Sequence, residues 1–492
     1  MYDYDAIIVG SGAAGGLLAS RLTMARKKVL LIEAGGFYNT NDFSRFEFDA
    51  LRKLWWDYRY TSNYELKTST PNEIALGMGR CVGGGTTIFD AVAYRVLPEN
   101  VDEWARQTKM SNVTGDPISF DDIVPYFEKI EKETGVRRYT DWELGTQKIS
   151  EGFSKLGLPL EPTPAFISPE CDHSGCLQGC PTGAKKSSLL LYVIPAIYEG
   201  MELLPNTTVT KVILERGEDG RAQARGVVFR DAGGTEGRKT AKIVVLCGGT
   251  LQTPQILLNS DITDFTGETR STGQIGRNMA AHTLSVIFGR FDDVLDNWIH
   301  HPLSAALMDY APVSKGGFSF EMSTVNEGPL NFAQAIADDD GNPMYGEKLK
   351  KITKDYKRMA GILLSVHDDN DGRVFIDENG DEKFYKPVTV SDMAKVGKGR
   401  DLAVEGLRSA GAKETFFSTL VSHHVQGSCR MGEDPSSSVT NSAGEMHDVS
   451  RLFVCDGSSI PSVVDVNPAL TIYVLAEMVS EHLLSERCLY FS

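Results

Sequence analysis

The sequence is poor in several features that would mark a particular class of protein. Cysteine is sparse, with 8 in 492 residues, which excludes a disulfide-stabilised scaffold. No apolar run reaches the roughly 18 residues that a membrane-spanning helix needs. Basic residues are outnumbered 50 to 66, and the net charge of −16 would repel nucleic acid and anionic membranes. We therefore expect no nucleic-acid partner and no membrane span.

The N-terminus also lacks the features of a signal peptide, because the chain enters "YDAIIVGSG" without a basic region or a cleavage site. We expect a cytoplasmic protein, periplasmic only if it is exported with a partner. The composition itself is typical of a globular protein, with 41% hydrophobic and 24% charged residues. The length allows two or three packed domains.

The N-terminal segment carries the pattern of a dinucleotide-binding fold. Residues 4–9 resemble a buried strand, and Gly10, Gly12 and Gly15 then lead into a helical stretch and a second strand that ends near Glu33. The glycines permit a tight turn, close backbone approach to a pyrophosphate, and helix–strand packing. The acid can accept hydrogen bonds from ribose hydroxyls. A glycine motif alone is often only a turn, but these parts in this order predict a dinucleotide site.

A second glycine-rich loop follows at residues 77–87. It comes after an aromatic, irregular segment, residues 37–64, whereas a nicotinamide-binding domain would continue with another βαβ repeat. A dense glycine run suits backbone that lies against a flat ring or a phosphate. A flexible surface loop is the alternative.

Further motifs follow along the chain. They are "GRCVGGGTT" (79–87), "GGTLQTPQILLNS" (248–260), "IGRNMAAH" (275–282), "HHVQGSCRMG" (423–432) and "LFVCDGSSIPSVVDVNPALTI" (452–472). With the N-terminal motif, and in this order, they resemble the motifs of the glucose–methanol–choline (GMC) FAD-dependent oxidoreductases. The match runs from end to end, although residues 283–420 carry it weakly.

The resemblance implies an α/β fold class: a Rossmann-like, doubly wound FAD-binding domain of the GMC type and an α+β substrate domain with an antiparallel sheet. The FAD-binding domain is expected to be discontinuous, formed by residues 1–95, 200–282 and 421–492. Residues 96–199 would form a helical excursion and a Cys-rich loop, and residues 283–420 the substrate-binding domain.

The resemblance also implies a catalytic pair. Oxidising an alcohol by hydride transfer needs a base for the hydroxyl proton, and histidine suits that task at neutral pH. His424 matches the family's active-site histidine, whereas His423 would point elsewhere on an extended strand. Asn467 stands at the partner position, where an amide can donate to the substrate oxygen. The alternative is an ordinary buried histidine and an asparagine that only precedes a helix.

FAD is expected to bind without a covalent bond, because Ile88 stands where some family members carry a linking histidine. Phe89 and Asp90 also depart from the family's usual residues near the flavin. The cofactor contacts implied by the resemblance are Gly10, Gly12, Ala13, Ala14, Gly15, Glu33, Ala34, Arg80, Gly83, Gly84, Gly85, Thr86, Val209, Gly248, Asp456, Asn467 and Pro468.

Three of the cysteines, Cys171, Cys176 and Cys180, lie within "CDHSGCLQGCP". Thiolates on a short glycine-containing loop before a proline can hold an iron–sulfur cluster. The loop also resembles that of FAD-dependent glucose dehydrogenase catalytic subunits, which hold a [3Fe-4S] cluster. A plain structural loop, a zinc site with His173 as fourth ligand, and a disulfide remain as alternatives.

In the middle of the chain, apolar and polar residues alternate as they do in the strands of a sheet. Strands are expected in "NTTVTKVILE", "ARGVVFRD", "KIVVLCGG", "TLSVIFGRF", "GGFSFEMS" and "MAGILLSVHD", and a hairpin in "DDNDGRVFIDENGDEKFY". The acids of that hairpin do not fit a calcium-loop pattern, which favours a solvated turn. His300 and His301 have no further ligands nearby in the sequence and are predicted to lie at the surface.

These observations predict an FAD-dependent oxidoreductase that oxidises a small-molecule alcohol or sugar to an aldehyde or ketone. Its electrons would pass to an acceptor other than oxygen, such as an electron-carrier protein or small subunit, through the cluster if the loop holds one. The alternatives are an oxygen-using oxidase of the long-chain-alcohol or sterol type that releases peroxide, a non-redox lyase or photoenzyme on the same scaffold, and a non-catalytic flavoprotein. The sequence does not choose the substrate, the acceptor or the oligomeric state.

Overall fold

The computed structural model describes residues 2–61, 74–172, 175–217, 220–260, 262, 272–296, 301–322, 328–338 and 342–491.

The first large sheet has a parallel core centred on β1 (Tyr4–Val9), which lies between β11 (Glu236–Leu246) and β2 (Val29–Ile32). β24 (Leu452–Val454) and β8 (Glu202–Leu204) extend this core in parallel. Strands covered on both faces are largely apolar, and the sequences "YDAIIV" and "VLLI" fit that position apart from the partly exposed Asp5. The remaining strands of this sheet are β9 (Thr208–Arg216), β10 (Ala222–Arg230) and β23 (Val449–Ser450).

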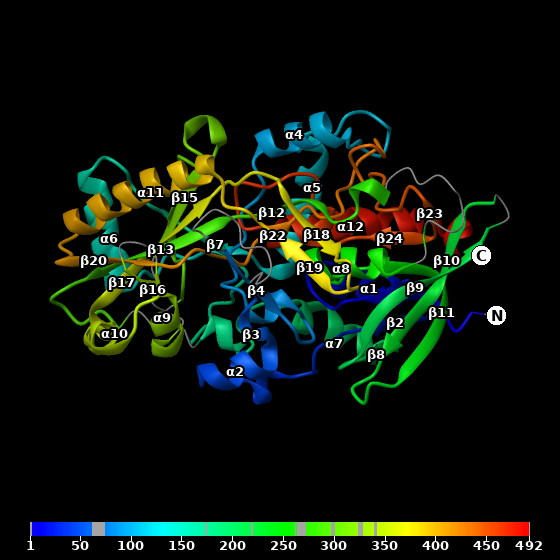
Figure 1. Cartoon of the computed structure of the whole chain (residues 1–492), viewed down its shortest axis with the longest axis horizontal. Coiled ribbons are helices and arrows are strands. Elements are labelled where there is room, and N and C mark those ends of the chain that lie inside the picture. Colours follow the sequence, from blue (N-terminus) through cyan, green and yellow to red (C-terminus); the bar gives the residue numbers. More distant parts are fainter. Residues whose placement is uncertain are drawn as a thin grey trace.

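The second large sheet is mostly antiparallel and centres on β13 (Thr283–Arg290), β17 (Met359–Val366) and β15 (Phe318–Met322). Figure 1 shows the two large sheets toward opposite ends of the long axis, with both chain termini beside the first. The other strands of the second sheet are β3 (Trp55–Thr61), β4 (Ala75–Gly79), β6 (Glu161–Pro162), β14 (Ala305–Leu307), β16 (Ile336–Ala337), β20 (Glu414–Ser418) and β21 (Val421–Ser422).

Two smaller sheets complete the strand pairing. β12 (Arg277–Ala281) and β22 (Val425–Gln426) pair with each other, and β12 also pairs with β18 (Gly372–Ile376). β18 in turn forms the predicted hairpin with β19 (Glu382–Tyr385). The last sheet consists of β5 (Arg137–Arg138) and β7 (Pro164–Ala165).

Helices cover both large sheets, and Figure 1 shows α6, α10 and α11 grouped around the second. Around the first sheet, α1 and α12 share one apolar cluster with α5. The helices are α1 (Ala13–Met24), α2 (Glu47–Leu54), α3 (Gly85–Ile88), α4 (Pro98–Thr108), α5 (Phe120–Thr134), α6 (Leu144–Lys155), α7 (Ile194–Tyr198), α8 (Gly249–Leu258), α9 (Pro329–Ala335), α10 (Gly346–Lys354), α11 (Val390–Ser409), α12 (Ala469–Ser485) and α13 (Arg487–Phe491).

The predicted fold class is confirmed, since a parallel sheet with helices and a separate antiparallel sheet are both present. The predicted strands correspond to β9, β10, β11, β13, β15 and β17. The domain limits stay a prediction. Strand pairing adds that β3, β4 and β21, from segments assigned to the FAD-binding domain, belong to the second sheet.

The prediction that His301 lies at the surface is wrong. Its side chain is 0% exposed, and its ring packs beside that of Tyr139 with 4.6 Å between centroids. The residues that follow, up to β14, are also buried against the second sheet, so the chain is already inside the molecule at this point. His300 lies outside the described residues.

Candidate active site

A cavity of about 630 Å³ runs between the two large sheets. One part of its wall comes from the loops that follow β1, β2 and β11, at the carboxyl ends of the parallel strands, where open α/β sheets bind their ligands. The other part comes from β13, β17 and α9 of the substrate half. Segments that are hundreds of residues apart in the sequence therefore meet at one site.

The first glycine loop has the close contacts that its sequence predicts. A Cβ on Gly10, whose φ is +95°, would lie 2.2 Å from the carbonyl oxygen of Cys247, and a Cβ on Gly15 would lie 1.9 Å from that of Gly10. Gly12 has no atom within 4 Å of a Cβ position and lines the cavity. The loop is thus packed tightly on its protein side and open toward the cavity at the start of α1, as an anion-binding helix N-terminus requires.

Glu33 lines the cavity after β2 and is 7% exposed. Its Oε2 accepts hydrogen bonds from the N–H and the Oγ of Ser11 at 3.0 and 2.7 Å, and its Oε1 accepts one from the N–H of Gly35 at 2.8 Å. Burial raises the pKa of this carboxyl, and these hydrogen bonds oppose the rise. Oε2 thus accepts two hydrogen bonds and Oε1 only one, so Oε1 keeps a second lone pair with which the carboxylate can still accept from a ligand.

The second glycine loop packs directly on the first. A Cβ on Gly84, at φ +52°, would lie 2.8 Å from the Cα of Gly12. The N–H of Gly83 donates to the Oγ of Ser11 at 3.0 Å. Gly84, Gly85 and Thr86 line the cavity, whereas the guanidinium of Arg80 lies over the ring of Trp56, 4.4 Å from its centroid.

Most of the predicted cofactor residues therefore surround one space. Gly15, Gly83 and Arg80 are outside the cavity wall, and the first two support the loops that form it. The predicted residues that line the cavity are Gly10, Gly12, Ala13, Ala14, Glu33, Ala34, Gly84, Gly85, Thr86, Val209, Gly248, Asp456, Asn467 and Pro468.

The predicted catalytic residues also lie on this wall, side by side. His424 stands between β21 and β22, and Asn467 stands two residues before α12. The Nδ2 of Asn467 lies 3.4 Å from the Nε2 of His424. His423 lines the cavity too, but its ring packs edge-on to that of Trp55.

Behind His424 lies a residue to which sequence analysis gave no role, His282, which is 1% exposed. Its Nε2 lies 2.5 Å from the carbonyl oxygen of Val464, and its Nδ1 lies 3.0 Å from the Nδ1 of His424. Burial lowers the pKa of His282 to about 4, so the ring is neutral and carries a single N–H at neutral pH.

These contacts fix which nitrogen carries each proton. A carbonyl oxygen only accepts, so the Nε2 of His282 donates to Val464 and its Nδ1 must accept. The Nδ1 of His424 is then the donor to His282, and the Nε2 of His424 carries a lone pair. That lone pair faces the N–H of Asn467. Burial, followed by the neighbouring His282 and His423, holds the pKa of His424 well below its usual value, which keeps this lone pair free at neutral pH.

A second residue without a predicted role, Glu321 on β15, holds Asn467 from the other side. Its Oε2 accepts from the Nδ2 of Asn467 at 3.3 Å, and the residue is 2% exposed. Burial raises the pKa of Glu321 to about 8. Cross-strand pairing places Glu321 beside Leu363, and Leu363 beside Val286, so all three side chains share one face of the sheet.

The three clustered cysteines are all partly buried. Burial raises the pKa of the Cys176 thiol, the charge of Lys185 opposes this rise, and Asp90, Cys171 and Cys180 add to it. Although burial opposes it, hydrogen bonds from Thr182 and from the backbone N–H of Lys185 hold the pKa of Cys180 below its usual value.

Within the described part of the chain, no group of three or more His, Cys, Asp or Glu side chains is arranged to hold a metal ion. The predicted iron–sulfur site is therefore not supported. The alternative zinc ligand, His173, lies outside the described residues.

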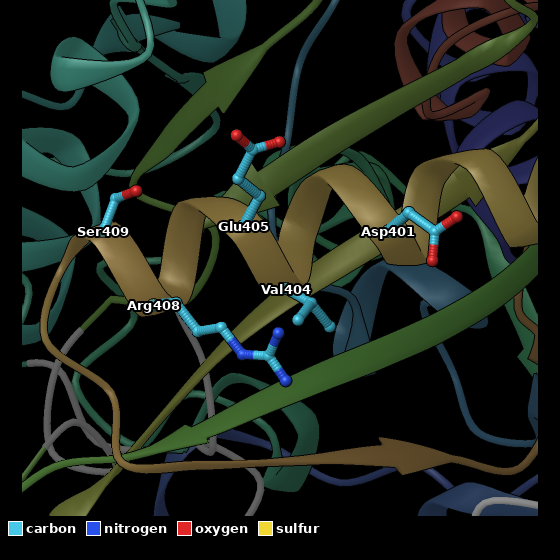
Figure 2. Close-up of a pocket in the computed structure, with 5 residues that line it drawn as sticks. All are labelled: Asp401, Val404, Glu405, Arg408 and Ser409. Atoms are coloured by element: carbon cyan, nitrogen blue, oxygen red, sulfur yellow. The ribbon is translucent and has the colours of Figure 1, made fainter.

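A shallow surface hollow on α11 is no rival to the cavity. Figure 2 shows its side chains on opposite sides of the helix, with Glu405 and Ser409 on one side and Val404 and Arg408 on the other. Such a divergent arrangement offers no enclosed space for a ligand. In the described residues we also find no helix with the length and apolar character of a membrane span.

Comparison with known proteins identifies the relatives of this chain. The model of the GMC oxidoreductase family matches residues 4–284 with its N-terminal part and residues 369–476 with its C-terminal part. The long-chain-alcohol oxidase FAO4B of Arabidopsis thaliana is 26% identical over 97% of this chain and 66% of its own length. This chain thus spans about two thirds of that plant relative.

Two further relatives match over almost their whole length. The fructose dehydrogenase large subunit of Gluconobacter japonicus is 23% identical over 98% of both chains. The crystal structure of pyridoxine 4-oxidase from Mesorbium loti superposes with a TM-score of 0.74 at 19% identity, covering 98% of this chain and 99% of that one. The structural match supports the fold.

Proposed function

The chain belongs to the GMC oxidoreductases, and on this premise we propose that it oxidises an alcohol to an aldehyde or ketone with non-covalently bound FAD. The observation that carries the proposal is the pair formed by the His424 Nε2 and the Asn467 Nδ2, 3.4 Å apart on the wall of a cavity that continues to both glycine loops. FAD would supply the acceptor for the hydride.

The residues around the cavity fit that cofactor. Gly12, open toward the cavity at the start of α1, would face the pyrophosphate, and Glu33 would accept from the ribose. Gly84 and Gly85 bring the second loop against the same region. Ile88, which lines the cavity, offers no nitrogen for a covalent bond.

In the proposed reaction His424 takes the hydroxyl proton on its Nε2, which carries the lone pair. The Nδ1–H of His424 then keeps its hydrogen bond to His282 while the ring is positively charged. Asn467 donates an N–H to the substrate oxygen and offsets the negative charge that develops there. Its other N–H stays with Glu321.

The substrate half of the cavity favours an alcohol with a long apolar body. Its wall includes Leu284, Val286 and Phe288, which follow each other at every second position of β13. Leu363 of β17 and Phe332 of α9 continue this surface. Burial of a methylene group contributes about 0.8 kcal/mol, so such a wall discriminates by chain length.

A larger side chain on this wall should reduce the length of the alcohol that the cavity can accommodate. In Val286→Phe we expect kcat/KM for primary alcohols to fall by about fourfold for each methylene that can no longer enter, which corresponds to about 0.8 kcal/mol. Short alcohols should keep their rate. The measurement is kcat/KM over a series from ethanol to dodecanol, with Val390→Phe at an 88%-exposed position as control. Equal losses for short and long alcohols would contradict the apolar substrate.

The electron acceptor is proposed to be a molecule other than oxygen, such as an electron-carrier protein or small subunit. A relative described as a large subunit supports a partner chain, whereas the oxidase relatives favour oxygen and peroxide release. The described residues of the cysteine loop do not form a metal-ligand group, so the proposed electron path does not pass through this loop.

One experiment tests the function and separates these cases. Anaerobically purified protein is examined for flavin absorbance and for iron, then mixed with primary alcohols. Flavin that bleaches with alcohol supports the proposal. Peroxide formed on admission of air would identify an oxidase, and iron at about three atoms per chain would restore the cluster. If none of the alcohols bleached the flavin, the lyase or photoenzyme would be favoured.

A further inference from the structure

Lys185 is a buried cation next to the proposed cofactor site, in the segment that follows the three cysteines. Its side chain is 2% exposed. The Nζ donates to three carbonyl oxygens, those of Thr87 at 2.7 Å, Phe89 at 3.1 Å and Cys176 at 2.5 Å. Burial lowers the pKa of this amine, and the nearby acidic groups Cys176, Cys180 and Asp90 oppose that change. An ammonium group has three N–H donors and a neutral amine only two, so the three acceptors match the charged form.

Two of those carbonyls belong to the segment that forms the cavity wall. Thr86, Ile88, Phe89 and Asp90 all line the cavity, and α3 begins within the second glycine loop. The carbonyl groups of Thr87 and Phe89 are bound to Lys185 instead of lying free. Lys185 thus fixes the backbone of this wall at two points two residues apart.

The same stretch of chain also holds the first glycine loop. Three residues after Lys185, the Oγ of Ser188 donates to the carbonyl oxygens of Ser11 and Gly12 at 3.1 and 2.9 Å. The N–H of Ser188 donates to the Oγ1 of Thr86 at 2.9 Å. One segment therefore connects both glycine loops to each other.

The cysteine loop makes further contacts with the same part of the cavity wall. The carbonyl of Cys176 is the third acceptor of the Lys185 ammonium, and the carbonyl of Leu177 accepts from the Nε1 of Trp55 at 3.2 Å. Leu177 and Trp55 both line the cavity. The loop can serve the site in this way without a metal.

We propose that Lys185 is a positioning residue that holds residues 87–90 against bound FAD and places a fixed positive charge beside it. The inference rests on the proposed function, because it requires FAD in the cavity. Reduction adds negative charge to the cofactor, and a nearby buried cation stabilises that charge because the local dielectric constant is low. The cation should therefore make the bound cofactor a stronger oxidant.

The test is the midpoint potential of the bound flavin, measured by spectroelectrochemistry on holoenzyme. In Lys185→Met we expect a shift to a more negative potential and less FAD per chain after gel filtration. Lys185→Arg keeps the charge and should stay close to the wild-type potential. Lys186→Met, at the adjacent lysine, is the matched control and should change neither quantity. Where Lys185→Met does not fold, the neutral Lys185→Gln takes its place.

A wild-type potential in the folded neutral variant would overturn the inference, even if its thermal stability fell. An equal shift in Lys185→Arg and Lys185→Met would overturn it as well, because loss of charge would then not be the cause. Wild-type protein that binds no FAD would instead refute the proposed function.

Discussion

Replacing His424 by alanine is expected to lower kcat for alcohol oxidation by about 10²- to 10⁴-fold, the range of a lost general base. The Nε2 of His424 is the lone-pair nitrogen beside Asn467, and the variant removes this acceptor for the hydroxyl proton. The hydrogen bonds of this side chain go to His282 and Asn467 and not to a glycine loop, so FAD content should stay at the wild-type level. Stopped-flow measurement of flavin bleaching under anaerobic conditions separates this step from reoxidation.

The same residue predicts a pH dependence. The pKa of His424 is held well below its usual value, so the neutral form with its lone pair is the dominant form at pH 7. As the pH falls through this lowered pKa, the lone pair is protonated and kcat/KM falls. The acid limb should therefore lie below about pH 6.5, where an ordinary histidine titrates. It should disappear from the residual rate of His424→Ala.

His423→Ala is the matched control, since it removes the neighbouring imidazole, which packs edge-on to Trp55. We expect its kcat to change by less than about tenfold, because His424 keeps its contacts to His282 and Asn467. If the two variants lost activity equally, or if His424→Ala bleached at the wild-type rate, His424 would not be the base.

The sequence alone was sufficient for those parts of the site that depend on local geometry. Gly10, Gly12 and Glu33 lie within one strand–turn–helix–strand unit, and each requirement is set by neighbours in the chain or by one adjacent strand. His424 and Asn467 were predicted from motifs that resemble those of the GMC family, and the structure brings the two side chains together.

What sequence analysis missed are the contacts between distant segments. His282 lies in a quoted motif, but its role depends on a ring 142 residues away. Glu321 reads as a polar residue in an apolar strand, and only sheet pairing turns it toward Asn467. Lys185 follows three cysteines whose spacing suggests metal ligands, and its contacts with the distant Thr87 and Phe89 have no signal in the sequence. The burial of His301 could not be predicted either, because it depends on the sheet that covers it.

His282→Leu is expected to lower kcat/KM by roughly 10²-fold without loss of FAD, because a residue that orients a catalytic group typically contributes one to two orders of magnitude. The hydrogen bonds of the His282 side chain go to His424 and Val464, and its effect on the reaction is expected to be exerted through the Nδ1 of His424. Leucine removes the acceptor for that N–H. His424 can then carry its proton on Nε2, and a ring in that form presents no lone pair to the alcohol.

A purely structural role for His282 makes a different prediction, which the pH profile and a conservative variant distinguish. Leucine leaves the buried carbonyl of Val464 without its donor, so some loss of thermal stability is expected whether or not the tautomer matters. In His282→Asn the side-chain oxygen can replace Nδ1 as the acceptor, and part of the lost kcat/KM should return although the contact to Val464 is weakened. In His282→Leu the acid limb of the pH profile of kcat/KM should also move, because the positively charged His424 loses its hydrogen-bond acceptor, the Nδ1 of His282. If rate and pH profile followed stability alone, with no recovery in His282→Asn, His282 would be a core residue and the lone pair on His424 would be held by Asn467 only.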